Sequence, residues 1–302
     1  MSDKKNPLVH FYDKNYKILT IVPMILLILS LGVIAFNYFS TGEVIGRDIT
    51  LKGGVTITVT KSANVDLASL ASKLLSENPG LEINVRSLAG TGFIVESDTV
   101  DQTRIDALVK DISGETGGLT NKDYSVQVIG SSLGQSFYKE AIFALLLAFI
   151  FMAVVVMIYF RNFVPSLLVI FAAFADIIMP FATMVLLHIK LSTAGIAAFL
   201  MLIGYSVDTD ILLTTRVLPW LKTRDSPIID YILNAMRTGL LMTITAIAVV
   251  LVAFFFSEAE TLKQIMLIMA IGLFFDIINT WLTNAGMLRW YLEARAKKND
   301  QA

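Results

Sequence analysis

The sequence contains no cysteine and only two histidines, His10 and His188. Disulfides, thiolate metal sites, a cysteine nucleophile and a histidine-rich metal cluster are therefore excluded. Charge is also scarce: charged residues make up 16% of the 302 residues, and the formal net charge is −1. Because no long basic run exists, a nucleic-acid partner has no electrostatic support.

Apolar residues dominate instead, at 55% of the chain with a mean hydropathy of +0.69. This composition is too apolar for a soluble domain and indicates an integral membrane protein. Six runs are long enough to cross a bilayer as helices. They cover approximately residues 18–39, 139–160, 164–187, 191–214, 240–256 and 262–288. The first run is too long for a signal peptide, so we interpret it as a retained anchor after a polar leader at 1–17.

The segment 40–137, between the first two spans, has the composition of a soluble domain. Alternating stretches predict strands near residues 55–60 and 81–86, and the turn at 89–92 predicts a second hairpin arm at 93–96. A last strand is predicted at 124–129, and helical periodicity predicts helices from 67 and 105. Thr99 with Gln102 resembles a capping box for the second helix. The order βαββαβ predicts a ferredoxin-like α+β domain. It contains no catalytic constellation.

Lysine and arginine set the expected orientation. They concentrate in the leader, in the loops that lie on the same side as the leader, and after residue 288. The positive-inside rule then predicts a cytoplasmic N-terminus at 1–17, an external domain at 40–137, a helix bundle at 138–290 and a cytoplasmic tail at 291–302.

Four aspartates lie inside the predicted spans, where no lysine or arginine lies deep. Each costs roughly 2.5–3.5 kcal/mol at a helix centre, so we predict a proton relay that begins with Asp208, with Asp210 and Asp176 as further members. Asp276, Thr243 and Thr245 are predicted to support it. Asp208 and Asp210 point about 200° apart on one helix and cannot share a partner. In the alternative, these side chains only accept hydrogen bonds from neighbouring helices and hold the bundle together.

Several motifs carry a family resemblance. These are Asp48 followed by Gly53-Gly54, Ala175-Asp176, the run Gly204-Tyr205-Ser206-Val207-Asp208, and Arg237-Thr238 followed by Thr243 and Thr245. Together they resemble the SecD/SecF family of protein-export membrane subunits, in the resistance-nodulation-division superfamily, and specifically its archaeal SecF branch. Thr209 stands where bacterial members usually have an acid, and Asp208 aligns with the fourth-span aspartate of SecD members.

The resemblance implies a subunit in the plasma membrane that pairs with a SecD-like subunit beside the Sec translocation channel. It further implies that the pair, surrounded by membrane lipid, promotes the export of unfolded polypeptides with the proton-motive force. No enzyme activity, cofactor, metal or nucleic acid is expected. Two alternatives remain: a non-energised scaffold of the translocon, and half of a small-molecule or lipid exporter from the same superfamily.

Overall fold

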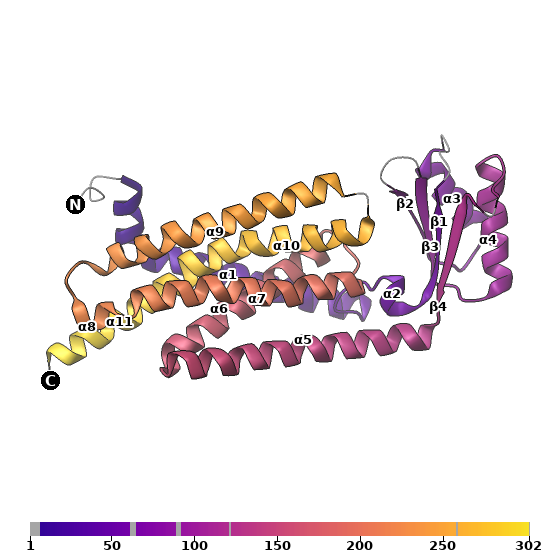
Figure 1. Cartoon of the computed structure of the whole chain (residues 1–302). Helices are drawn as coiled ribbons and strands as arrows, with labels where there is room; N and C mark the ends of the chain where they lie inside the picture. Colours follow the sequence, from indigo (N-terminus) through magenta and orange to yellow (C-terminus); the bar gives the residue numbers. More distant parts are fainter. Residues whose placement is uncertain (1–6, 61–64, 89–91, 121, 258, 302) are drawn as a thin grey trace.

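The computed structural model describes residues 7–60, 65–88, 92–120, 122–257 and 259–301. It consists of an elongated helix bundle with a small sheet domain at one end (Figure 1).

The bundle contains six helices that are long and apolar enough to cross a membrane, which confirms the predicted number of spans. The first five are α1 (Pro7–Thr41), α5 (Ser131–Phe160), α6 (Phe163–Leu186), α7 (Thr193–Val217) and α9 (Ile228–Phe256). The sixth is a continuous run of α10 (Glu260–Ile278), the π-helix η2 (Asn279–Asn284) and α11 (Ala285–Asp300). The short helix α8 (Trp220–Thr223) precedes α9.

Four helices extend further than hydropathy predicts, among them α1, which begins at Pro7 rather than near residue 18, and α5, which begins at Ser131 rather than near residue 139. Helix α9 begins at Ile228 rather than near residue 240, and the sixth run stays helical to Asp300, through most of the polar tail. Leu292 and Ala296 of that tail are buried, and Leu292 packs in a core cluster with Ile228 and Ile232 of α9. Hydropathy detects the lipid-crossing part of a helix, whereas these ends are stabilised by amphipathic packing beyond it.

Helix α7 occupies the centre of the bundle and packs against α5, α6, α9 and α10. Its neighbour α6 carries several buried small residues, among them Ala172, Ala173 and Ala175, and Ala173 packs with Val207 of α7. Small side chains allow close helix approach where lipid provides no hydrophobic driving force for association. Polar side chains on these helices therefore come within hydrogen-bonding reach.

The sheet domain follows α1 and the short helix α2 (Ile49–Lys52). Its elements are β1 (Gly54–Val59), α3 (Leu67–Glu77), β2 (Ile83–Leu88), β3 (Gly92–Ser97), α4 (Gln102–Glu115) and β4 (Tyr124–Ile129). The strands lie in the order β2-β3-β1-β4 and all pairs are antiparallel. Helices α3 and α4 cover the face of the sheet that points away from the bundle (Figure 1). Alternate residues such as Val55, Ile57 and Val95 are buried in the core with these helices.

The predicted capping box is wrong in detail. The N-cap of α4 is Asp101, whose carboxylate accepts a hydrogen bond from Thr103 N at 2.9 Å. Thr99 instead accepts from Asp101 N at 3.3 Å. Threonine and aspartate are both favourable N-cap residues, and here Asp101 is the N-cap because it directly precedes the first helical residue, Gln102.

The Asp48 and Gly-Gly motif joins the sheet domain to the bundle. Gly53 has a φ of +87°, and a Cβ there would lie 2.4 Å from Ser131 Cα at the start of α5. The chain thus enters and leaves the domain through a backbone contact that only glycine permits. Asp48 N donates to Leu191 O at 2.8 Å, immediately before α7.

Candidate functional site

Three aspartates form a buried cluster in the middle of the bundle, between α6, α7 and the α10–η2 run. We call Asp176, Asp210 and Asp276 the carboxylate cluster; each is at most 1% exposed. The side chains that hydrogen-bond them are neutral serine, threonine and asparagine.

Asp176 links three helices. It accepts hydrogen bonds from Asn279 Nδ2 of η2 at 2.6 Å and from the Ser206 hydroxyl of α7. The carboxylate therefore ties α6 to both neighbours at one point.

Asp276 and Asp210 are joined through a shared hydroxyl. Thr280 Oγ1 lies 3.2 Å from Asp276 Oδ1 and 3.1 Å from Asp210 Oδ1. Thr209 Oγ1 donates to Asp276 Oδ1 at 2.9 Å, and Asn284 Nδ2 donates to Asp210 Oδ1 at 2.7 Å. The more distant Thr243 Oγ1 lies 3.5 Å from Asp276 Oδ2. A continuous polar path therefore runs from Asp276 to Asn284.

The π-helix η2 supplies many of the polar partners. Asn279, Thr280, Thr283 and Asn284 are all buried. Such one-turn π segments widen the helix locally and occur frequently at functional sites. Trp281 of the same turn packs over Gly239 of α9, where a Cβ would lie 2.2 Å from the indole. This large side chain fixes the turn against its neighbours.

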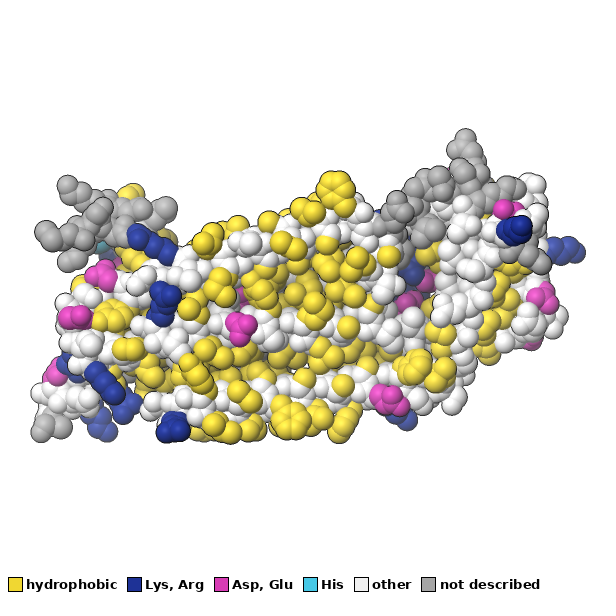
Figure 2. All heavy atoms as spheres, in the orientation of Figure 1, with side chains coloured by type: hydrophobic (Ala, Val, Ile, Leu, Met, Phe, Trp, Pro, Cys, Tyr) yellow, Lys and Arg dark blue, Asp and Glu magenta, His cyan; other side chains and the backbone are white. Residues whose placement is uncertain are grey.

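The side of α7 that faces away from the carboxylate cluster is exposed. Met201, Gly204 and Asp208 share one exposed face, which we call the exposed face of α7. As the helical spacing predicts, Asp208 is exposed while Asp210 is buried. On the face of the molecule that Figure 2 shows, hydrophobic side chains are spread over the middle of the bundle and most Lys and Arg side chains lie toward its ends.

The predicted site residues thus separate into two groups. Asp176, Asp210, Asp276, Ser206 and Thr243 come together in the interior. Asp208 and Gly204 lie on the exposed face, Tyr205 donates its hydroxyl to Met242 O at 2.9 Å, and Thr245 is exposed and bonds its own helix at Leu241 O.

Sequence reasoning missed Thr209 and Asn284 as partners of the cluster. Asn284 follows Thr280 by four residues, so a polar stripe at helical spacing was a signal that could have found it. Thr209 was not predicted as a partner, because the sequence analysis considered it only as the residue that replaces the acid usual in bacterial members.

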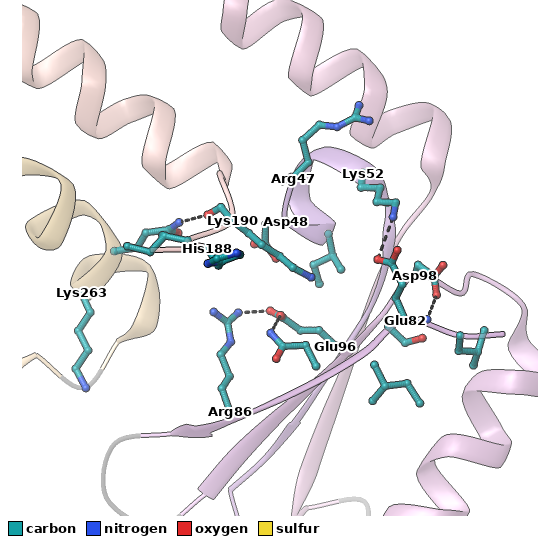
Figure 3. Close-up of a pocket in the computed structure, with 18 of the residues that line it drawn as sticks. Arg47, Asp48, Lys52, Glu82, Arg86, Glu96, Asp98, His188, Lys190 and Lys263 are labelled. Atoms are coloured by element: carbon teal, nitrogen blue, oxygen red, sulfur yellow. Dashed lines mark hydrogen bonds and ion pairs between the residues drawn. The ribbon is translucent and has the colours of Figure 1, made fainter. Parts of the chain in front are cut away.

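A second feature is a cleft of about 840 Å³ between the sheet and the nearest helix ends (Figure 3). Two ion pairs line it: Arg86 with Glu96, and Lys52 with Glu82 at 3.1 Å. Burial, followed by the nearby Asp48, raises the pKa of Glu96, against the opposing effect of Arg86. Sequence patterns did not indicate this cleft.

Residues 109–294 match the family model described as protein export membrane protein SecD/SecF, C-terminal. The chain belongs to the SecD/SecF family. A protein-export membrane protein SecF from Methanocaldococcus jannaschii is 41% identical over 294 residues, covering 94% of this chain and 99% of the relative. One of the same name from Methanolacinia petrolearia is 37% identical over 298 residues, covering 95% and 98%. The resemblance to archaeal SecF members is confirmed.

Solved structures of the family show the same fold. The crystal structure of SecDF, a translocon-associated membrane protein from a Thermus species, matches with a TM-score of 0.75 at 20% identity. The match covers 96% of this chain but 39% of that longer chain. A SecDF structure in a super-membrane-facing form matches with a TM-score of 0.63 at 21% identity.

Proposed function

We propose that this chain is the SecF-type subunit of a protein-export complex and that it pairs with a SecD-type subunit through the exposed face of α7. The names of its relatives and the 39% share of the SecDF chain that it matches support a two-subunit arrangement. The pair works beside the translocation channel in the plasma membrane. There it promotes the movement of unfolded polypeptides, with both termini of this chain cytoplasmic and the sheet domain, ferredoxin-like in strand order, outside.

Asp208 carries the pairing proposal. It is exposed near the middle of α7, which belongs to the candidate span Thr193–Thr223. A carboxylate facing lipid there would cost roughly 2.5–3.5 kcal/mol on insertion scales, whereas a partner helix supplies polar groups. A Cβ at Gly204, one turn before Asp208, would meet nothing within 4 Å, so this position leaves room for that helix.

The energy source in this proposal is the proton gradient. Asp208 receives the proton at the subunit interface, and Asp176 and Asp210 are further candidates behind it. A proton that crosses the membrane releases about 2.3 kcal/mol per 100 mV. Proton exchange in the carboxylate cluster alters the hydrogen bonds that hold α6, α7 and η2 together, and this change is passed along the helices to the sheet domain.

A non-energised scaffold is the competing function. The observation that favours it is the donor set of the cluster, because each of its three carboxylates accepts a hydrogen bond from a neighbouring helix. In that case the cluster only stabilises the bundle.

Cysteine cross-linking tests the pairing directly, because the chain has no cysteine of its own. We expect Gly204→Cys to cross-link to single cysteines along the fourth span of a co-expressed SecD-type subunit. The control is Ile28→Cys, at a position that is 67% exposed on α1. Helix α1 lies behind α7 in the view of Figure 1. Equal cross-linking at both positions, or none at Gly204→Cys, would contradict the proposed interface.

A further inference from the structure

The π-helix η2 presents two asparagines to the carboxylate cluster from positions five residues apart. Asn279 Nδ2 donates to Asp176 of α6 at 2.6 Å, and Asn284 Nδ2 donates to Asp210 of α7 at 2.7 Å. In an α-helix, side chains five residues apart point about 140° from each other. The i→i+5 hydrogen bonds of a π turn bring such residues nearly into line. The π conformation therefore lets both asparagines face the cluster.

This conformation leaves one backbone carbonyl without a donor in its own helix. Ala285 N donates to Thr280 O, five residues back, and α11 then continues with the four-residue spacing of an α-helix. At that spacing the donor for Leu282 O is Gly286 N, so the carbonyl that is passed over is Trp281 O. Trp281 is 2% exposed. A buried carbonyl of this kind needs a donor from elsewhere in the structure.

Helix α1 supplies that donor. The hydroxyl of Tyr12, in the first turns of α1, donates to Trp281 O at 2.7 Å. The ring of Tyr12 packs against the core cluster that contains Trp281. Two turns further along α1, Thr20 Oγ1 lies 3.0 Å from Leu282 O. Two successive carbonyls of η2 are thus in contact with hydroxyl groups of α1.

The close approach of α1 to the sixth span depends on a glycine. A Cβ at Gly286 would lie 1.8 Å from Thr20 Oγ1, so a side chain at this position would push the two helices apart. On the other side of Tyr12, Arg289 Nη1 lies 2.7 Å from Asp13 Oδ1. These two contacts fix α1 against the sixth span and hold the hydroxyl of Tyr12 at the carbonyl that it bonds.

We propose that Tyr12 is a positioning residue of the carboxylate cluster. Its hydroxyl stabilises the π conformation of η2, and η2 in this conformation holds its asparagine and threonine side chains on the three carboxylates. Without this donor the α conformation is favoured, because it leaves no carbonyl unpaired, and Asn279 and Asn284 then turn away from each other. This inference goes beyond the proposed function, and it holds for a proton relay and for a scaffold alike.

Hydrogen exchange of the purified full-length chain tests the effect on η2. Tyr12→Phe removes only the hydroxyl, so we expect the amides of residues 279–286 to exchange at least ~5-fold faster, as the loss of one buried hydrogen bond implies. The matched control is Tyr16→Phe, one turn along α1, because the Tyr16 hydroxyl donates to Glu293 of α11 at 3.0 Å instead. It should leave the exchange of residues 279–286 unchanged.

Infrared spectroscopy separates positioning of the cluster from general stabilisation of the bundle. The carboxyl bands of Asp210, identified by their loss in Asp210→Asn, should shift in Tyr12→Phe because the donors to Asp210 move. They should stay in place in Tyr16→Phe. The proposal is overturned if Tyr12→Phe leaves either the exchange of residues 279–286 or these bands unchanged, or if the two tyrosine variants behave alike. Such a result leaves the pairing proposal standing, since pairing concerns the exposed face of α7.

Discussion

At the junction between the sheet domain and the bundle, Gly53 is required for steric reasons. Gly53 combines a left-handed φ with a backbone neighbour in the way of any side chain, whereas Gly80 has the same φ of +87° with nothing within 4 Å. The comparison separates the conformational cost of replacing glycine from the cost of the contact.

We predict that Gly53→Ala destabilises the protein by clearly more than Gly80→Ala. A φ of +87° costs alanine about 1–3 kcal/mol at either position, and only at Gly53 must the start of α5 also move. Thermal unfolding of the two variants in the same detergent gives the comparison. Equal losses of stability would show that the backbone contact at Ser131 is unimportant.

We predict that the stability of the sheet domain depends on pH through Glu96. Its pKa is raised by burial, so the folded state holds the proton more tightly than the unfolded state does. Its contribution to stability is therefore full at low pH and is lost as the pH rises through the folded pKa.

Hydrogen exchange of the β3 amides, corrected for intrinsic rates, should accordingly show more protection at about pH 5 than at about pH 8. Glu96→Gln should flatten this difference, whereas Glu82→Gln, at an exposed carboxylate, should retain it. The assignment to Glu96 fails if its glutamine variant keeps the full pH dependence.

The aspartates of the candidate site could be predicted from the sequence, because charged residues in apolar spans are rare. The opposite directions of Asp208 and Asp210 followed from helix geometry alone. The polar stripe at helical spacing could have indicated Asn284, but its pairing with Asp210 depends on the three-dimensional approach of η2 to α7. The capping residue of α4 failed for a local reason, the competition between Thr99 and Asp101.

At the scale of elements, α7 and η2 act as a matched pair. On α7, the hydroxyls of Ser206 and Thr209 donate hydrogen bonds to the carboxylate cluster. On η2, the side chains of Asn279 and Thr280 donate to the same cluster. Thr209 Oγ1 and Thr280 Oγ1 lie 3.5 Å apart. Their effects on stability should therefore not be independent.

A double-mutant cycle of Thr209→Val and Thr280→Val should give a coupling free energy of about 0.6 kcal/mol, the average measured for hydrogen bonds between membrane helices, and at most about 1.7 kcal/mol. Unfolding in mixed micelles is a suitable measurement. The control cycle pairs Thr209→Val with Thr245→Val, whose hydroxyl bonds its own helix, and should give a coupling near zero. Additive effects in the first cycle would contradict the shared network.

Element types were predictable for a physical reason. Length and hydropathy identify lipid-crossing helices, and alternation together with the turn at 89–92 indicated the strands of the sheet. The helix ends beyond the membrane could not be predicted in this way, because their stability comes from packing against residues distant in sequence. Leu292, which packs against α9, is an example. The π-helix was equally hidden, because its polar spacing resembles that of an ordinary helix.

At the scale of the whole molecule, the bundle and the sheet domain are mechanically continuous through α7. Leu191, just before α7, exchanges backbone hydrogen bonds with Gly46 and Asp48 on the way into the domain. Thr193 N also donates to Thr50 Oγ1 at 3.3 Å. A displacement of α7 at its aspartates therefore has a direct route to the sheet domain, which the proposed export function needs.

The most direct test of the account is export of a reporter protein by vesicles carrying Asp208→Asn, with and without an uncoupler, after assembly with the SecD-type subunit has been verified. We predict that the assembled variant exports only at the level that the unmodified complex shows in the presence of the uncoupler. Normal, uncoupler-sensitive export by the assembled variant would contradict a role for Asp208 in energy coupling.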